Sequence, residues 1–277
     1  MIDCAAIYGL GLAAGRRPLT GDAPPALAAV GGISLLDHAL DRLAAQGVRR
    51  AVASAHHHRA RLEEDIARRG GAPRTEILAE PEALGSAAAL AAAARRLGDA
   101  PFYAVAADQI WFDGFMPALA RLARKWDAER MDALILLQPV ARAIGYEGRG
   151  DFFLDPAGQA RPRVGGEIAG HAFCGVSVLH PRALAGIQDP RAALEDVLAA
   201  RAEEGRLRAI AHDGEWCPHP DRAAAALLEV AIGYRPVPAA AAERLSPRDR
   251  LGAPDPVMAL AAPPRRRMLR LGARRLP

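Results

Sequence analysis

Apolar runs of four to eight residues alternate with segments of helical period along the first 232 residues of the chain. The runs predict buried strands over residues 4–8, 48–53, 75–79, 102–107, 133–138, 151–154, 173–179 and 206–211. The intervening periodicity predicts helices over residues 35–46, 59–69, 85–97, 115–126 and 221–232, and another that begins at 189–190. This alternation is typical of βα units, and it predicts an α/β fold around a mostly parallel sheet.

Local signals sharpen two of these elements. Ser34 is placed to cap the helix over residues 35–46, Asp37 stands at the reciprocal capping position, and Gly47 supplies the stop. The strand over residues 102–107 ends at Asp108. Because open α/β sheets bind ligands beyond the carboxyl ends of their strands, Asp108 is a candidate site residue.

The periodic pattern fades after residue 232, where proline, alanine and arginine dominate. We therefore predict one domain over residues 1–232 and a disordered tail over residues 233–277. The formal net charge is +4 and six arginines lie in the last fifteen residues, so the domain itself is close to neutral. Such a tail suits contact with nucleic acid or an anionic membrane surface, or a solvated chain end. We expect the solvated end, and no nucleic-acid partner.

Cysteine usage and hydropathy point to the cytoplasm. Cys4, Cys174 and Cys217 are widely spaced and odd in number, which predicts reduced core residues rather than disulfides or a zinc site. The start of the chain lacks the basic region of a signal peptide, and no run of about 18 apolar residues marks a membrane span. We expect a cytoplasmic protein without a membrane span.

The first strand leads into a loop rich in glycine and arginine. The loop contains Gly9, Gly11, Gly15, Arg16 and Arg17. Glycines let backbone N–H groups converge on a phosphate, so the loop is a candidate phosphate cradle. Residues 9–14 also match the dinucleotide fingerprint Gly-x-Gly-x-x-Ala. That fingerprint opens a helix and precedes an acidic residue at the end of a second strand. Neither feature follows here, so we favour the phosphate cradle.

The same segment continues with Pro18-Leu19-Thr20 and Pro24-Pro25, and in this order it resembles the sugar-1-phosphate nucleotidyltransferase family. Residues 80–87 and the strand end at Asp108 resemble the same family. Residues 148–152 and 173–181 are similar to its N-acetylmuramate-1-phosphate uridylyltransferase subgroup. The resemblance covers about residues 3–232. It implies a three-layer α/β/α, Rossmann-like nucleotide-diphospho-sugar transferase fold with a mostly parallel mixed sheet.

The resemblance also implies a reaction and a set of site residues. A sugar phosphate would attack the α-phosphorus of a nucleoside triphosphate, with UTP the expected donor, and pyrophosphate would leave. Asp108 would hold Mg²⁺, and Arg16 or Arg17 would contact phosphate. The nucleotide would lie against Gly9, Gly11, Gly15, Glu82, Leu84, Gly85 and Ser86. The sugar phosphate would lie against Gly150, Asp151 and Gly175.

Three departures from the family pattern fall on groups that bind phosphate or metal. Gly15 stands where the family carries an arginine, Pro25 where it carries a lysine, and Pro218 where it carries a second metal-binding carboxylate. The neighbouring His219 is interpreted as a loop residue, and the only lysine, Lys125, lies about a hundred residues from Pro25. Each lost charged contact typically costs about a hundredfold in rate, so we expect a weak or lost activity. The alternatives are a pseudoenzyme that binds a nucleotide or sugar nucleotide without turnover, and a ligand-free scaffold.

Overall fold

The computed structural model describes residues 2–10, 24–56, 58–220 and 222–233. Within these residues, strands and helices alternate. The strands are β1 Cys4–Tyr8, β2 Ala29–Val30, β3 Ile33–Ser34, β4 Arg50–Ala55, β5 Arg74–Ala79, β6 Phe102–Ala106, β7 Gln109–Phe112, β8 Ala133–Pro139, β9 Phe152–Leu154, β10 Ala160–Pro162, β11 His171–Leu179, β12 Leu207–Ala211 and β13 Glu215–Pro218. The α-helices are α1 Leu35–Ala45, α2 Arg59–Arg69, α3 Ser86–Leu97, α4 Ala118–Lys125, α5 Leu194–Glu203 and α6 Arg222–Gly233, and the 3-10 helices are η1 Pro25–Leu27, η2 Val140–Arg142 and η3 Pro181–Leu184.

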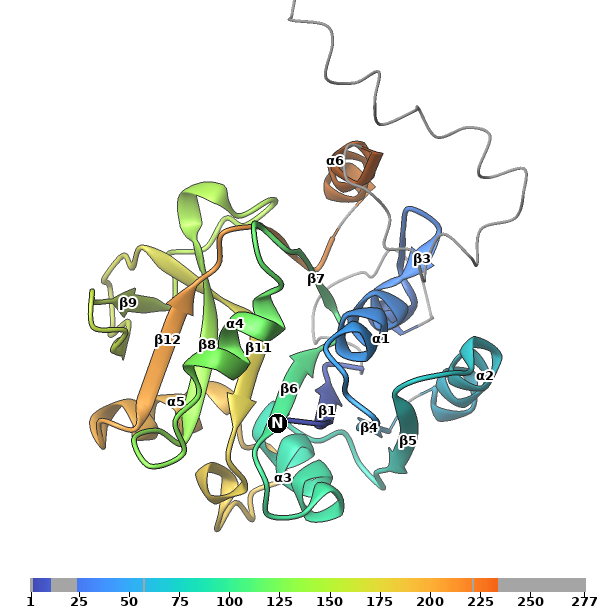
Figure 1. Cartoon of the computed structure of the whole chain (residues 1–277), viewed down its shortest axis with the longest axis horizontal. Helices are drawn as coiled ribbons and strands as arrows, with labels where there is room; N and C mark the ends of the chain where they lie inside the picture. The colour runs from blue at the N-terminus through green and yellow to red at the C-terminus, as the bar shows by residue number, and fades with distance from the viewer. Residues whose placement is uncertain (1, 11–23, 57, 221, 234–277) are drawn as a thin grey trace, which may run out of the picture. The chain divides into compact units, whose positions relative to one another are not determined.

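A mixed sheet forms the centre of the fold (Figure 1). Its strand order is β10-β9-β11-β6-β1-β4-β5, and β8 and β12 extend it from β11. Strands β6, β1, β4 and β5 are parallel to one another, and β12 is parallel to β8. Strand β11 runs antiparallel to both β6 and β8. The predicted α/β class with a mostly parallel mixed sheet is confirmed.

Helices cover both faces of this sheet. On one face, α3 and α5 bury Leu90 and Leu198 in a cluster with side chains of the strands. On the other face, α1, α2 and α4 bury Leu40, Leu62 and Leu122 in a second cluster. Successive strand residues contribute to the two clusters in turn, because side chains alternate across a strand. The three layers match the predicted α/β/α arrangement.

The chain divides into two units, Met1–Glu229 and Val230–Pro277. Helix α6 ends at Gly233, beside the predicted domain boundary at residue 232. Of the predicted tail over residues 233–277, all but the first residue lies outside the described residues. Among the helices that the structure describes, none is long and apolar enough to cross a bilayer.

The start of α5 differs from its prediction. The helix begins at Leu194, whereas the sequence predicts a start at Asp189. The carboxylate of Asp189 accepts a hydrogen bond from the backbone N–H of Arg191 at 2.9 Å. The carbonyl oxygen of Pro190 accepts one from the N–H of Gly85 at 2.7 Å. Because these bonds hold the segment in a turn against the start of α3, the helix starts later.

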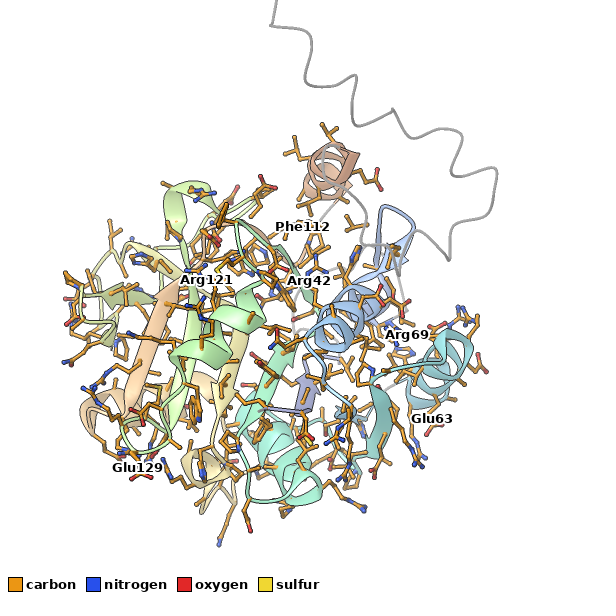
Figure 2. The ribbon with its side chains drawn as sticks, viewed as in Figure 1. Arg42, Glu63, Arg69, Phe112, Arg121 and Glu129 are labelled. Atoms are coloured by element: carbon orange, nitrogen blue, oxygen red, sulfur yellow. The ribbon has the colours of Figure 1, made fainter. Side chains whose placement is uncertain are left out.

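Arginines fix α1 on two sides. The Arg69 side chain is only 4% exposed, and its Nη2 lies 2.6 Å from Asp41 Oδ1, which joins α2 to α1. The guanidinium of Arg42 lies 5.1 Å and 5.2 Å from the ring centres of Trp111 and Phe112, within cation–π range. Figure 2 shows Arg69 between α1 and α2, and Arg42 near Phe112. Helix α1 is therefore held against both its helical neighbour and β7.

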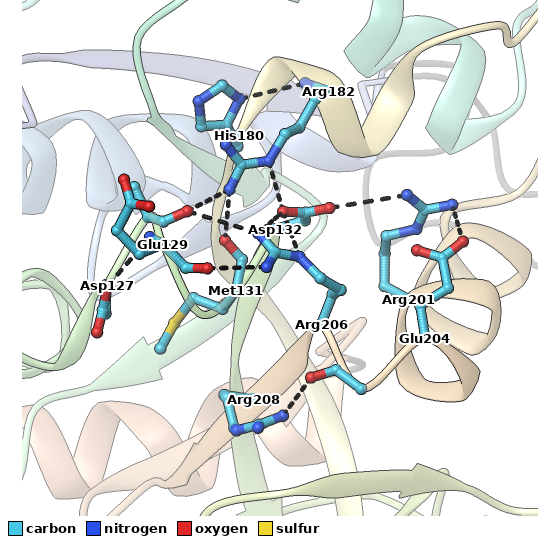
Figure 3. Close-up of polar contacts among 12 residues, drawn as sticks. Asp127, Glu129, Met131, Asp132, His180, Arg182, Arg201, Glu204, Arg206 and Arg208 are labelled. Atoms are coloured by element: carbon cyan, nitrogen blue, oxygen red, sulfur yellow. Dashed lines mark hydrogen bonds and ion pairs between the residues drawn. The ribbon is translucent and has the colours of Figure 1, made fainter.

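Three arginines converge on Asp132, just before β8 (Figure 3). Oδ1 of Asp132 accepts hydrogen bonds from Arg182 Nε and Arg206 Nη2, each at 2.6 Å. Oδ2 lies 3.7 Å from Arg201 Nη1, and the Asp132 side chain is 6% exposed. Burial raises the pKa of Asp132, but the hydrogen bonds from Arg206 and Arg182 outweigh it and hold that pKa below its ordinary value. The cluster ties β8 to η3, α5 and the start of β12.

Helix α4 ends in two positive side chains, Arg124 and Lys125. Both are exposed, and Lys125 is the only lysine of the chain. Positive side chains at the carboxyl end of a helix interact favourably with its dipole. The position of Lys125 is therefore explained by the helix to which it belongs.

Candidate functional site

A cleft at the carboxyl ends of the parallel strands has two compartments. The larger compartment has a volume of about 1170 Å³ and the smaller one about 420 Å³. Side chains or backbone of β1, β4, β5 and β6 ends line the smaller compartment, and the larger one extends to β9, β10 and α5. Both compartments are lined by Asp108, Gln109, Phe173, Glu195 and His219. We call the place where these shared residues lie the junction.

Asp108 stands at the junction, in the turn between β6 and β7. Its side chain is 14% exposed. Gly9 lies directly against it, because a Cβ on Gly9 would stand 2.8 Å from Asp108 Oδ1. With a φ of +74°, Gly9 also has a left-handed backbone that other residues rarely adopt. Two of the predicted site residues are thus brought together, and the contact requires glycine at position 9.

His219 faces Asp108 across the junction. Strand β13 pairs antiparallel with β7, with Pro218 opposite Gln109, so the next residue of the chain arrives beside Asp108. Nδ1 of His219 lies 3.2 Å from Oδ2 of Asp108. The φ of His219 is +45°, a region that His, Asn and Asp enter more readily than most residues. The family pattern predicts the second metal ligand at position 218, whereas the strand register places His219 beside the Asp108 carboxylate.

Three residues predicted to bind nucleotide line the smaller compartment: Gly9, Leu84 and Ser86. Glu80 lines it as well, and its Oε1 accepts a hydrogen bond from Ser54 Oγ at 2.8 Å. A volume of about 420 Å³ falls within the usual range of small-ligand pockets, about 300–1000 Å³. The compartment can therefore hold part of a small ligand whose other end reaches the junction.

Two other residues predicted to bind nucleotide, Glu82 and Gly85, lie outside both compartments. A Cβ on Gly85 would stand 2.4 Å from the carbonyl oxygen of Ala192, so this glycine is needed where α3 approaches the segment before α5. Ser86 strengthens the same approach, because its Oγ accepts a hydrogen bond from the N–H of Leu194 at 2.8 Å. Glu82 is exposed, and neither Glu82 nor Gly85 lines a compartment. Their contacts with nucleotide stay predictions.

Asp151 lines the larger compartment and is held in place by its neighbours. Its Oδ2 accepts a hydrogen bond from the N–H of Phe173 at 2.9 Å, and its Oδ1 accepts one from the Tyr146 hydroxyl at 3.4 Å. Gly150 has a φ of +72°, and a Cβ there would stand 2.2 Å from the carbonyl oxygen of Ala169. Gly150 therefore shapes the loop that presents Asp151, and of the two only Asp151 lines the compartment.

Gly175 lies in an irregular part of β11, next to the junction. Its φ is +68°, and a Cβ there would stand 3.0 Å from Gln109 Nε2. The hydroxyl of Tyr8 donates to the Gly175 carbonyl at 3.2 Å. Burial, followed by the negative charges of Asp108 and Glu195, raises the pKa of Tyr8 well above its ordinary value. The phenol therefore stays protonated and remains a donor.

Four predicted site residues, Gly11, Gly15, Arg16 and Arg17, lie outside the described residues. Their predicted contacts with phosphate stay predictions. Pro25 begins η1 soon after this segment, and it lines the larger compartment. The position that carries a lysine in the resembling pattern therefore reaches the cleft, but with an uncharged side chain.

The Asp108 carboxylate fits a Mg²⁺ ion that is bound mainly by substrate phosphates. Mg²⁺ commonly takes one or two protein carboxylates, while phosphates and waters complete its shell. Within the described ranges, no group of three or more His, Cys, Asp or Glu side chains is arranged to hold an ion. Pro218 lines the larger compartment and adds no side-chain oxygen. The donor set thus suits an ion delivered with phosphates rather than a protein cage.

The described lining of the larger compartment is rich in carboxylates: Asp108, Glu147, Asp151, Glu195 and Asp196. Arg163 lies among them, and its Nε and Nη1 donate to the carbonyl oxygens of Gly150 and Gly165 at 2.8 Å. Like charges at short range repel, most strongly where water is excluded. A negatively charged ligand in this compartment would therefore need positive charge to offset these carboxylates.

The sequence did not indicate Gln109 and Trp216 as site residues. Nε1 of Trp216 donates to Oε1 of Gln109 at 2.9 Å, across the β7–β13 pair. One signal was available, because the apolar run at residues 102–107 resumes after Asp108 and continues to residue 112. That pattern indicates a second strand directly after a turn. It does not indicate the partner strand, which lies more than a hundred residues along the chain.

Comparisons with known proteins bear on the family and the fold of this chain. The sequence profile of the family described as "Nucleotidyl transferase" matches residues 12–147. An N-acetylmuramate alpha-1-phosphate uridylyltransferase from Caulobacter vibrioides is 34% identical over 216 residues, which cover 76% of this chain and 89% of the relative. HddC from Yersinia pseudotuberculosis complexed with GMP-PN has a TM-score of 0.67 and 15% identity, and covers 83% of this chain and 100% of its own. A UTP-bound UGPase from Acinetobacter baumannii has a TM-score of 0.67 and 16% identity, with 88% and 98% covered. The two solved structures share the fold.

Proposed function

Since the chain belongs to the sugar-1-phosphate nucleotidyltransferase family, we propose that it transfers a nucleotidyl group from a nucleoside triphosphate to a sugar-1-phosphate. UTP is the proposed donor, because the relative from Caulobacter vibrioides is a uridylyltransferase. The observation that carries the proposal is the position of Asp108 at the junction of two compartments, where two substrates would meet. We expect the protein to act in the cytoplasm.

In the proposed reaction, the smaller compartment binds the nucleoside and the larger one binds the sugar phosphate. A phosphate oxygen of the sugar phosphate attacks the α-phosphorus, the bond from that phosphorus to the bridging oxygen of pyrophosphate breaks, and pyrophosphate leaves. The attacking phosphate is already ionised, so no side chain has to remove a proton. Mg²⁺, when bound, would neutralise phosphate charge. Asp108 would hold this ion, and Gly9 leaves the carboxylate room at the loop after β1.

We expect the reaction to be slow. Pro25 and Pro218 line the larger compartment without charge, where the family pattern carries a lysine and a carboxylate. Each lost contact to developing charge typically costs about a hundredfold. Arg16 or Arg17 is the proposed source of the remaining positive charge near the phosphates.

A second candidate function is binding of a nucleotide or sugar nucleotide without turnover. The observation that favours it is the His219 ring, whose Nδ1 lies 3.2 Å from Oδ2 of Asp108, the carboxylate proposed to hold the ion. Such a protein would keep the ligand pocket and lose the transfer. Binding and turnover are separable by experiment, because ligand binding to the folded state raises stability by mass action.

The test is pyrophosphate release by the full chain with Mg²⁺, each of the four ribonucleoside triphosphates and a panel of sugar-1-phosphates. Asp108→Ala is measured in parallel. Release that needs both substrates and disappears in Asp108→Ala supports the transferase. A nucleotide-induced rise in melting temperature without release supports the binding protein. If folded protein shows neither response, both proposals are overturned and a ligand-free scaffold is left.

A further inference from the structure

The carboxamide of Gln109 has a fixed orientation at the junction. An indole N–H can only donate, so the Gln109 atom 2.9 Å from Trp216 Nε1 must be the amide oxygen. Trp216 is itself closely packed, since it is 2% exposed and its ring lies 5.7 Å from the ring of Tyr146. The amide cannot flip, exchanging its oxygen and nitrogen, without losing this bond. Its –NH₂ group is therefore held on the side away from Trp216.

Gly175 provides the space for that –NH₂ group. A Cβ at position 175 would stand 3.0 Å from both Cδ and Nε2 of Gln109, which is tighter than ordinary contact. Among the residues that the structure describes, Oε1 of Gln109 is bonded to Trp216, and Nε2 makes no hydrogen bond. The two N–H bonds of Nε2 are thus available to an acceptor that enters the cleft. Gln109 lines both compartments, as does its neighbour Asp108.

We propose that Gln109 donates through Nε2 to a phosphoryl oxygen at the junction, and that Trp216 is the positioning residue that holds this donor in place. The inference rests on the proposed function, which brings phosphates to Asp108. Phosphoryl oxygens are the acceptors expected there, and a neutral donor binds them without pairing with the carboxylates of the larger compartment. The amide supplies part of the stabilisation that a lysine or arginine supplies elsewhere in the family pattern.

Two substitutions at position 109 separate the donor from its structural bond. Gln109→Glu keeps the shape and the oxygen that Trp216 needs, but replaces –NH₂ with a negatively charged oxygen. Gln109→Met removes both the amide oxygen and the –NH₂ group. Gln188→Glu is the matched control, because Gln188 is exposed and lines neither compartment. We expect Gln109→Glu and Gln109→Met each to lower kcat/KM for pyrophosphate release by about a hundredfold or more. Gln188→Glu should retain the wild-type value.

Binding gives a second readout that does not depend on turnover. UTP should raise the melting temperature of the wild type in EDTA, and Gln109→Glu should lose most of this rise because its carboxylate repels phosphate. EDTA removes any gain from a new metal ligand. The melting temperature of Gln109→Glu without UTP should stay within about 2 °C of wild type, since its fold contacts are kept.

The role of Trp216 is tested by a double-mutant cycle. Trp216→Phe should lower kcat/KM in the wild-type background and have little further effect in the Gln109→Met background. Equal effects in both backgrounds would overturn the positioning role. A Gln109→Glu variant with wild-type kcat/KM and a wild-type response to UTP would overturn the donor role while leaving the proposed function intact. If the wild-type protein neither releases pyrophosphate nor responds to UTP, the donor role and the proposed function are both overturned.

Discussion

Asp108 and Asp132 stand at opposite edges of the same sheet and have opposite surroundings. Asp108 follows β6 at the carboxyl edge, whereas Asp132 precedes β8, which runs parallel to β6, at the amino edge. Asp132 is buried among three arginines. Asp108 has His219 beside one oxygen and Gly9 against the other. The carboxylate of Asp132 is surrounded by arginine partners, whereas that of Asp108 keeps acceptor capacity for a ligand.

The comparison teaches how the fold separates stability from binding. At Asp132, a desolvated carboxylate is compensated by hydrogen bonds, and removing it would leave partly buried guanidinium groups without a partner. At Asp108, the carboxylate is near few positive groups among the residues that the structure describes. Folding gains little from such a carboxylate, while a bound cation gains much. We therefore expect substitutions at the two aspartates to affect different properties.

The largest expected effect is on activity at position 108. Asp108→Ala should lower kcat/KM for pyrophosphate release by at least about a hundredfold, because it removes the proposed metal ligand. Its free energy of unfolding should change by less than about 1 kcal/mol, since few contacts of the fold depend on this carboxylate. Initial rates and urea unfolding followed by tryptophan fluorescence measure the two quantities. A stable variant with the wild-type rate would contradict the assignment.

The next effect is on stability at position 132. Asp132→Ala should lower the free energy of unfolding by about 3 kcal/mol, at the low end for a broken buried pair, because the three arginines are 22% to 40% exposed. The rate per folded molecule should not change. Glu167→Ala is the control, since it breaks an exposed pair with Arg161 and should cost much less stability. Equal losses in the two variants would show that the cluster contributes no more than a surface pair.

A smaller effect sharpens the contrast by completing the metal site. His219→Asp should raise Mg²⁺-dependent pyrophosphate release by about tenfold, because it places beside Asp108 a second carboxylate that would help to hold the ion. The left-handed backbone at position 219 tolerates aspartate. Pro218→Asp, which restores the motif position, should have less effect, because Pro218 pairs with Gln109 rather than facing Asp108. The reverse order of the two variants would refute the register argument.

The smallest effect is the pH dependence that Asp132 confers. Its folded pKa lies below the ordinary value of 3.8, so its contribution to stability is complete above that pH and declines as the pH falls toward the folded pKa. Urea unfolding at pH 7, 4 and 3 should show the difference between wild type and Asp132→Asn shrinking below pH 4. A difference that stays constant down to pH 3 would mean that the arginines do not lower this pKa.

The sequence predicted most strands of the central sheet, because these are short apolar runs, but it did not predict β7, β10 or β13. The helix α1 begins after Ser34, whose Oγ accepts from the N–H of Asp37 at 3.0 Å, as the capping pattern predicts. The predicted start of α5 was wrong because a local turn at Asp189 and the bond from Gly85 to the Pro190 carbonyl outweigh the helix signal. Such bonds depend on tertiary structure, which periodicity does not contain.

The site was predictable where its residues follow strand ends in the chain. Gly9 and Asp108, which follow β1 and β6, line the cleft; Asp151 also lines it, but it precedes β9 and was predicted from the family resemblance. The contacts of His219 with Asp108 and of Gln109 with Trp216 could not be predicted from spacing, because both depend on the register between β7 and β13. A motif places a residue in a sequence window, whereas the register decides which neighbour in that window faces the partner.

The single lysine at the end of α4 has a practical consequence. Lys125 carries the only side-chain primary amine of the chain, it is exposed, and it lines neither compartment. An amine-directed fluorophore or surface tether therefore has one side-chain attachment point, which lies outside the cleft. Labelled protein should therefore be uniform at its side chains. Enzymes that modify lysine likewise find a single side chain here.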